Sequence, residues 1–450
     1  MASTFLTRTI ATATSTKIGT FSCWVKRANL TDGRMFSSWG SGTSQFWIIF
    51  QSDKISIADY DGSYNLQYVT NRLFRDTSAW YHILVAFDTT QGTSGDRVKL
   101  YVNGVQETSF STSTAPSQNQ VLNFSNSGEE FRIGKRDSEE YLDGLMSHIH
   151  FVDGTALTPA TFGETDSTSG IWKPKASPSG ITYGNNGFFL KFENSGAMGT
   201  DSSGESNTFT VSGTLTQNTD TPTNNFTVLN AVNNGAAAST LTNGNLTYSL
   251  SNYSHNTRST MALTAGKWYW EQKISDNNTR IGLCTSGFRN DLDTDSTDAI
   301  IGGAGNGGLF LIMSNSSTSW QLTNNNTSRS VTTYTNAIAS SANDILMGAV
   351  DVDAGKLWIG VNGTWFNSGN PATAATPTLT FTNNGTDPLQ VYAGFGTDSA
   401  RVVHYNFGSG YFGTTAVASA NADANGHGKM EYALPSGFYT ICTKNIKEFG

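Results

Sequence analysis

Apolar and polar residues alternate with a period of two along much of this chain, and this pattern constrains the fold more than any other feature. Residues 81–87 place Tyr81, Ile83, Val85 and Phe87 on one side of an extended backbone. The alternation recurs at residues 21–26, 98–102, 268–271, 309–312 and 346–350. Because successive side chains of a strand point to opposite faces, these segments predict half-buried β-strands.

Turn residues stand between these segments at short intervals. The strands ending at residues 102 and 361 are each followed by an Asn-Gly pair, which readily adopts the positive φ angles of a tight hairpin. Only residues 158–163 predict a helical turn, with Thr158 as its cap and Pro159 at its first position. Many strands without a long helix predict an all-β protein built from antiparallel sandwiches.

Composition agrees with a β-rich fold and excludes several classes of protein. Charged residues make up 14% of the 450 residues, and Lys plus Arg (27) against Asp plus Glu (35) leave a net charge of −8. Without a basic run, the chain is not expected to grip nucleic-acid phosphates. It has no apolar stretch of about 18 residues, so we expect no membrane span. The first residues lack the pattern of a secretory signal, which predicts synthesis in the cytoplasm.

The three cysteines, Cys23, Cys284 and Cys442, are widely separated and form no Cys-x-x-Cys pair. We therefore expect neither a disulfide framework nor a cysteine zinc site.

The alternation divides the chain into two tandem sandwiches. It fades between residues 214 and 240 into Thr, Asn, Gly and Ala, which predicts a linker or a strap between domains. We expect a first sandwich with its closing segment over residues 1–213 and a second over residues 241–413. Residues 414–450 are expected to form a C-terminal extension.

The first half resembles the laminin-G-like, concanavalin A-like sandwich in the variant common in tailed phages of marine bacteria. The segments that match are residues 5–9, 20–27, 80–88, 100–104, 132–134, 142–151 and 156–159. This resemblance implies a jelly-roll sandwich for the first half.

The second half resembles the SPRY (B30.2) sandwich in its phage form. The segments that match are residues 266–271, 281–283, 351–358, 361–365, 406–408 and 411–413. Both folds are general binding scaffolds, so the resemblances imply architecture more directly than activity.

Catalysis on glycosidic bonds needs two carboxylates held across one cleft. Sandwich glucanases resembling the first half carry them as Glu-x-Asp-x-x-Glu on one strand, and this string is absent here. Glu129-Glu130 and Glu139-Glu140 are adjacent pairs whose side chains would diverge on a strand. We therefore expect no enzymatic activity.

Two patterns raise the question of a metal. Asp291, Asp293 and Asp295 lie in a string of oxygen ligands of the kind calcium prefers, and residues 201–207 form a second such loop. We favour solvated loops and no cofactor, with calcium at these aspartates as the alternative. His148 and His150 are expected on one strand face with Met146, as a packed or surface pair and not a zinc site.

Two aromatic positions are candidate glycan-binding sites. Asp59, Tyr60, Asp61 and Tyr64 surround a glycine turn, where carboxylates can accept from sugar hydroxyls and a ring can stack on a sugar face. Trp320 is a second candidate platform. The alternative for both is ordinary packing at a hairpin tip or sheet edge.

The resemblances and the composition together predict a non-enzymatic structural protein on the surface of a tailed-phage virion. It would serve as a capsid decoration, a fibre or a tail-fibre component, in many copies or as a homo-oligomer. Its expected partners are other virion proteins and, through weak multivalent contacts, host surface glycans. A polysaccharide depolymerase and a purely architectural capsid cement protein remain the alternatives.

Overall fold

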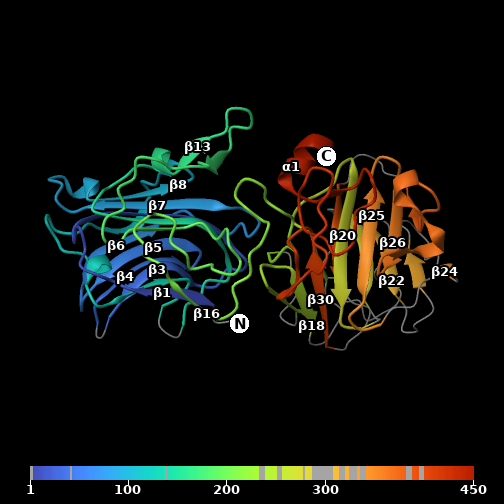
Figure 1. The fold of residues 1–450 in the computed structure, drawn as a ribbon, viewed down its shortest axis with the longest axis horizontal. Coiled ribbons are helices and arrows are strands. Elements are labelled where there is room, and N and C mark those ends of the chain that lie inside the picture. Colours follow the sequence, from blue (N-terminus) through green and yellow to red (C-terminus); the bar gives the residue numbers. More distant parts are fainter. Residues whose placement is uncertain are drawn as a thin grey trace. The chain divides into compact units, whose positions relative to one another are not determined.

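The computed structural model describes residues 4–40, 43–136, 139–232, 239–250, 256–276, 279–285, 308–313, 320–323, 332–334, 341–381, 388–394 and 400–450. The chain divides into two compact units, Met1–Gln217 and Asn218–Gly450 (Figure 1). Both are built from β-sheets whose strands run antiparallel almost throughout. The protein is therefore all-β, as the alternation predicts.

The first unit is a sandwich of two sheets, which we call the β5 sheet and the β7 sheet. The β5 sheet has the order β10 (Phe110–Thr114), β6 (Tyr64–Thr70), β5 (Lys54–Tyr60), β4 (Gln45–Gln51), β3 (Gly33–Trp39), β11 (Glu130–Ile133), β1 (Phe5–Thr9) and β16 (Thr210–Ser212). The β7 sheet has the order β15 (Phe188–Leu190), β12 (Gly144–Asp153), β2 (Ile18–Arg27), β7 (Tyr81–Asp88), β8 (Val98–Val102) and β9 (Val105–Gln106). A separate hairpin pairs β13 (Gly163–Thr165) with β14 (Trp172–Pro174). Three 3-10 turns complete the unit: η1 (Ser94–Asp96), η2 (Asn123–Ser125) and η3 (Pro159–Thr161).

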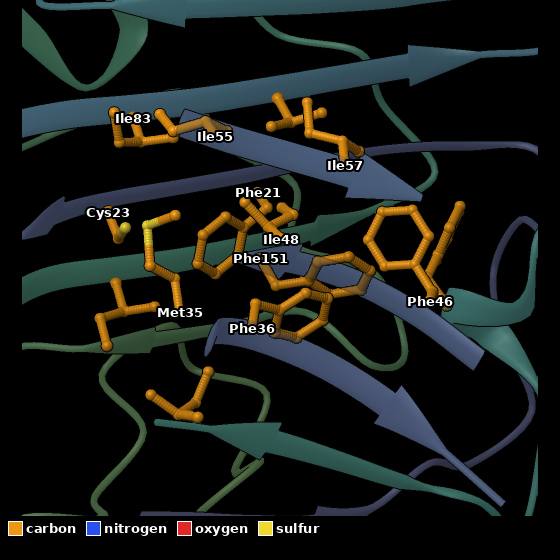
Figure 2. Packing of buried hydrophobic residues seen from close by; sticks show 14 of the residues in the cluster. Phe21, Cys23, Met35, Phe36, Phe46, Ile48, Ile55, Ile57, Ile83 and Phe151 are labelled. Atoms are coloured by element: carbon orange, nitrogen blue, oxygen red, sulfur yellow. The ribbon is translucent and has the colours of Figure 1, made fainter. Parts of the chain in front are cut away.

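Phenylalanine rings fill the space between these two sheets. Phe21 of the β7 sheet stacks on Phe36 of the β5 sheet with ring centroids 4.8 Å apart. Phe131 and Phe151 meet across the same gap at 5.0 Å. Figure 2 shows Phe36, Phe46 and Phe151 in this core together with isoleucines from both sheets. Each ring comes from the apolar side of an alternating strand.

The second unit also holds two packed sheets. The β20 sheet has the order β17 (Ser239–Thr242), β18 (Thr247–Leu250), β30 (Arg401–Asn406), β20 (Lys267–Ile274), β25 (Ile345–Asp351), β26 (Lys356–Val361) and β27 (Thr364–Trp365), with β28 (Leu379–Thr380) beside β26. The β21 sheet has the order β19 (Asn256–Arg258), β29 (Leu389–Gly394), β21 (Arg280–Thr285), β22 (Gly308–Met313), β23 (Trp320–Thr323) and β24 (Thr332–Tyr334). The smaller elements are β31 (Tyr411–Phe412), β32 (Thr415–Ala416), η4 (Phe366–Ser368) and η5 (Pro371–Thr373).

The hairpins and the helical turn take the form that their residues predict. Asn103 and Gly104 have φ of 49° and 81°, and Asn362 and Gly363 have φ of 48° and 85°. The turn after residue 158 is the 3-10 turn η3, although the Thr158 side chain makes no capping hydrogen bond. One element was not expected from the sequence, the helix α1 (Thr443–Phe449).

The C-terminal segment is tied into the second unit by buried carboxylates. Glu271 of β20 is fully buried and accepts hydrogen bonds from the backbone N–H groups of Glu431 (2.9 Å) and Tyr432 (2.8 Å). The Tyr269 hydroxyl donates to it as well, at 2.9 Å. Burial raises the pKa of Glu271 to about 7. The strand β33 (Tyr439–Thr440) then runs parallel to β20, so residues 414–450 belong to this unit.

Part of the segment that the sequence assigns to a linker is also packed in the second unit. Phe226, Val228 and Leu229 are 3%, 2% and 0% exposed, and the last two join the core that Trp268 and Trp270 share with the β21 sheet. The backbone N–H of Thr227 donates to Ile441 at 3.0 Å, which ties this segment to the C-terminal one.

Cys23, Cys284 and Cys442 are buried free thiols. No helix within the described residues is long and apolar enough to cross a membrane.

We predict that residues 218–450 fold alone and that residues 241–450 do not. Removing Phe226, Val228 and Leu229 exposes their core partners, at roughly 1.5–3 kcal/mol for each side chain, which together approaches the whole stability of a domain. Thermal unfolding followed by circular dichroism should give a cooperative transition for the longer fragment only. A cooperative melt of residues 241–450 with an unchanged midpoint would contradict the prediction.

Candidate functional site

The candidate site lies on the face of the β5 sheet that points away from the core. Alternation along β4 sends Phe46 and Ile48 into the core, as Figure 2 shows, and therefore places Gln45 and Trp47 on the opposite face. We call this the outer face. The register of the sheet aligns its side chains into rows that cross the strands.

One row contains most of the aromatic residues of the outer face. Tyr64 of β6 pairs with Tyr60 of β5, Tyr60 with Gln45 of β4, and Gln45 with Trp39 of β3. The Tyr60 and Tyr64 rings meet edge to face at 5.1 Å. Trp47, in the neighbouring row, reaches Tyr64 at 6.2 Å. The rings of Tyr60, Tyr64 and Trp47 form one continuous aromatic surface, and Trp39 lies beyond Gln45 in the row.

These rings are only partly covered. Tyr64 is 46% exposed, and Trp39, Trp47 and Tyr60 are half-buried. By contrast, the side of the β7 sheet that faces away from the core is covered by residues 157–189. There Phe162, Tyr183 and Phe189 pack on Leu84 and Val152. The outer face of the β5 sheet is therefore the better candidate for contact with a ligand.

Arginines pack against the tryptophan rings of the outer face. The Arg34 guanidinium lies 4.9 Å from the centre of the Trp47 ring, and Arg132 and Arg136 lie 5.8 and 5.1 Å from Trp39. Each of these arginines also meets a carboxylate: Arg34 pairs with Glu140 at 2.5 Å, Arg136 with Glu139 at 2.9 Å, and Arg132 with Glu130 at 3.1 Å. The positive charge of the face is thus locally balanced.

Of the residues singled out around the glycine turn, Tyr60 and Tyr64 lie on the outer face, whereas Asp59 points into the sandwich. Its side chain is fully buried and its carboxylate accepts from the backbone N–H of Asn123 at 2.6 Å and from the Asn123 and Asn65 amides at 3.0 and 3.1 Å. Asp59 therefore holds η2 against the hairpin and has no free oxygen for a sugar. Asp61 is exposed and accepts from the same Asn65 amide at 2.9 Å.

Burial raises the pKa of Asp59 to about 6, although its hydrogen bonds to Asn123 and Asn65 work in the opposite direction. The folded protein therefore holds this proton more tightly than the unfolded chain does. As the pH falls through about 6, the Asp59 side chain takes up a proton in the folded protein.

The other residues singled out in the sequence lie elsewhere. Trp320 begins β23 of the second unit, with backbone pairing to Met313 and Tyr334. Asp291, Asp293 and Asp295 lie outside the described residues. In the second acidic loop, the Asp201 carboxylate accepts hydrogen bonds from the protein itself, including those from the backbone N–H groups of Phe189 (2.8 Å) and Asn207 (2.8 Å).

The histidines form a packed cluster on the covered side of the β7 sheet. His150 Nδ1 lies 2.9 Å from the Tyr183 hydroxyl and its ring stacks on Phe189 at 3.8 Å. A β-bulge at residues 147–150, where His148 has a φ of 47°, turns Met146 toward the main core. The expectation that Met146 shares a face with His150 is therefore wrong.

The imidazoles of this cluster are held in their neutral form by burial. Burial lowers the pKa of His82 to about 3 and that of His150 well below its usual value. No group of three His, Cys, Asp or Glu side chains in the described part of the chain is arranged to hold a metal ion.

Trp39, Gln45 and Trp47 were missed in the sequence. The signal that could have located Gln45 and Trp47 is the run Phe46, Ile48 and Phe50, because residues between buried alternating positions face outward. Their proximity to Tyr60 depends on strand pairing, which sequence periodicity does not supply.

Comparisons with known proteins agree with this architecture. The family model described as "Concanavalin A-like lectin/glucanases superfamily" matches residues 4–162, so the first unit contains a concanavalin A-like domain. No curated protein matches the chain.

Solved structures similar to the chain include two SPRY domains and a pentraxin. The PSpry domain of TRIM65 is 16% identical, with 40% of this chain and 89% of that chain covered and a TM-score of 0.30. The SPRY domain of human HERC1 is 15% identical, with 39% of this chain and 96% of that chain covered and a TM-score of 0.28. A heptameric SAP-like pentraxin from Limulus polyphemus is 17% identical, with 34% of this chain and 71% of that chain covered and a TM-score of 0.26.

The raised pKa of Asp59 predicts a pH dependence of stability. Its contribution to the free energy of unfolding is present in full below about pH 4 and is lost as the pH rises through about 6, a change of ~3 kcal/mol. Because Asp59→Asn removes this titration, the stability advantage of the wild type over the variant should shrink by that amount between about pH 4 and pH 7. Denaturant unfolding of the first unit measures it, with Asp96→Asn, at an exposed aspartate paired with Lys99, as the control. An advantage that stays constant or grows with pH would refute the assignment.

Proposed function

We propose that the chain is a non-enzymatic binding protein of a tailed-phage virion, displayed as a capsid decoration, fibre or tail-fibre component. It binds host surface glycans through the outer face of the β5 sheet. The observation that carries this proposal is the row formed by Tyr64, Tyr60, Gln45 and Trp39, with Trp47 beside it. Exposed aromatic rings stack on the apolar faces of sugars, while neighbouring amides exchange hydrogen bonds with hydroxyls.

Three glutamates near this face are neutralised by arginines, which supports binding without turnover. Glu130, Glu139 and Glu140 are each paired with an arginine, at 3.1, 2.9 and 2.5 Å. A glycosidase acid must carry a proton near neutral pH, and a nearby cation opposes this by stabilising the ionised form.

The virion assignment is supported by the sequence resemblance of both halves to phage sandwiches. Display in many copies on a particle suits a shallow aromatic surface, because multivalency raises the effective affinity of weak individual contacts. Mass spectrometry of purified particles produced by the encoding genome tests this part, and a chain absent from the particles would contradict it.

Binding and turnover are separated by one experiment with host envelope polysaccharide. We expect the protein to release no new reducing ends and to bind only when clustered on a multivalent support. Tyr60→Ala combined with Tyr64→Ala should weaken this binding at least tenfold, because two stacking rings are lost, with little change in the melting temperature. Tyr101→Ala, on the β7 sheet, is the control for loss of a tyrosine elsewhere.

Sustained release of reducing ends, abolished by one carboxylate substitution, would replace this proposal with a polysaccharide depolymerase. Binding that the double tyrosine substitution leaves unchanged would move the glycan site away from the outer face. Absence of all glycan binding by the clustered protein would favour an architectural cement protein.

A further inference from the structure

Two buried polar atoms on the outer face have no hydrogen-bond partner. They are the Gln45 side-chain oxygen Oε1 and the Arg34 nitrogen Nη1, and their residues are only 7% and 3% exposed. Leaving a buried polar group unpaired costs roughly 1–3 kcal/mol. Such groups are satisfied by ordered water or by a ligand, and the aromatic rings beside Gln45 favour a ligand here.

Both atoms belong to residues that adjoin Trp47. Gln45 and Trp47 occupy successive outward positions of β4, while Arg34 pairs with the next outward position, Ile49. The Arg34 guanidinium is stacked against the Trp47 ring. An acceptor and a donor, both without partners, therefore flank one half-buried indole ring.

We propose, building on the glycan-binding function above, that this part of the outer face binds an extended, neutral, hydroxyl-rich polysaccharide chain lying across the strands. A hydroxyl both donates and accepts, so one chemical class can satisfy Gln45 Oε1 and Arg34 Nη1 together. A carboxylate or phosphate only accepts, and would leave Gln45 without a donor. It would also lie near the Glu140 carboxylate, which already neutralises Arg34 at 2.5 Å.

The direction of the row determines the shape of the ligand. Tyr64, Tyr60, Gln45 and Trp39 lie on four neighbouring strands, so the row spans about 14 Å at the usual strand spacing. A single sugar would contact one ring of such a row. A chain segment would contact several rings at once and gain affinity with each added unit.

Access to Gln45 depends on the two rings beside it in the row. Trp39 and Tyr60 are half-buried, and partly exposed side chains change rotamer rapidly. Binding as proposed requires that rotation of one of these rings expose the Gln45 oxygen to a hydroxyl of the bound chain.

The test compares Gln45→Leu with the wild-type full-length protein, clustered on a support and titrated with the host polysaccharide and its mono-, di- and tetrasaccharide fragments. The variant removes the acceptor but preserves side-chain volume. We expect about tenfold weaker binding of the tetrasaccharide, the loss of one hydrogen bond to a buried group. We also expect an equal or higher melting temperature, because the unpaired acceptor is gone. Gln118→Leu, at an exposed glutamine that lies outside the β5 sheet, is the control.

A merely structural glutamine would give the opposite thermal result. A lower melting temperature for Gln45→Leu, or unchanged binding, overturns the proposal. Arg34→Lys provides a second reading, because it keeps the charge beside Glu140 but removes the guanidinium nitrogens, and we expect it to weaken binding severalfold.

The neutral character of the ligand has its own comparison. The same polysaccharide, with its primary hydroxyls oxidised to carboxylates, should bind more weakly than the untreated polymer. Equal or tighter binding of the oxidised polymer overturns the choice of a neutral chain, and equal affinities for the mono- and tetrasaccharide overturn the extended site. If neither polymer binds, the proposed function itself fails.

Discussion

Packing of phenylalanine rings between the two sheets of the first unit is the interaction on which the rest of that unit depends. Phe36 contacts Phe21, Phe46, Phe131 and Phe151, with ring centroids 4.8 to 6.2 Å apart. Because the backbone alternates, placing Phe46 and Ile48 in this core commits Gln45 and Trp47 to the other face. A one-residue slip of β4 would exchange the two sets, so burial of the core side fixes the register that aligns the outer aromatic row. The arrangement of the proposed binding surface is in this sense a consequence of the core.

The outer face combines ion pairs and stacked arginines, which stabilise the sheet, with unpaired buried polar atoms, which do not. The Arg34–Glu140 and Arg136–Glu139 pairs, and the arginines stacked on Trp39 and Trp47, favour a flat arrangement of long side chains. Gln45 Oε1 and Arg34 Nη1 oppose stability because each is buried without a partner. Functional surfaces commonly retain such groups, since the contacts that a ligand needs are incomplete in its absence. Asp59 differs from both because its side chain accepts three hydrogen bonds, which connect η2 to the hairpin that carries Tyr60 and Tyr64.

Much of this architecture follows from periodicity, while the site depends on pairing. The strands at residues 81–88 and 98–102, and both Asn-Gly hairpins, form where alternation and turn residues predict them. The burial of Asp59 could also have been inferred, because it continues the alternating series Ile55 and Ile57 toward the core. The proximity of Trp39 and Gln45 to Tyr60 could not, since it depends on the pairing register of the consecutive strands β3, β4 and β5, which periodicity alone does not supply. The packing of Phe226 and Val228 was likewise hidden, because isolated apolar residues in a polar segment resemble a linker.

The central claim is that the outer face of the β5 sheet is where this protein binds a glycan. The most direct measurement is a heteronuclear NMR titration that follows the indole N–H signals of the tryptophans, assigned through Trp→Phe variants, as host-derived oligosaccharide is added. The account predicts that the Trp39 and Trp47 signals shift in a saturable manner. Those of Trp24 and Trp172, which pack around His82 on the covered side of the β7 sheet, should stay in place. Saturable shifts confined to tryptophans of the second unit, with Trp39 and Trp47 unmoved, would contradict it.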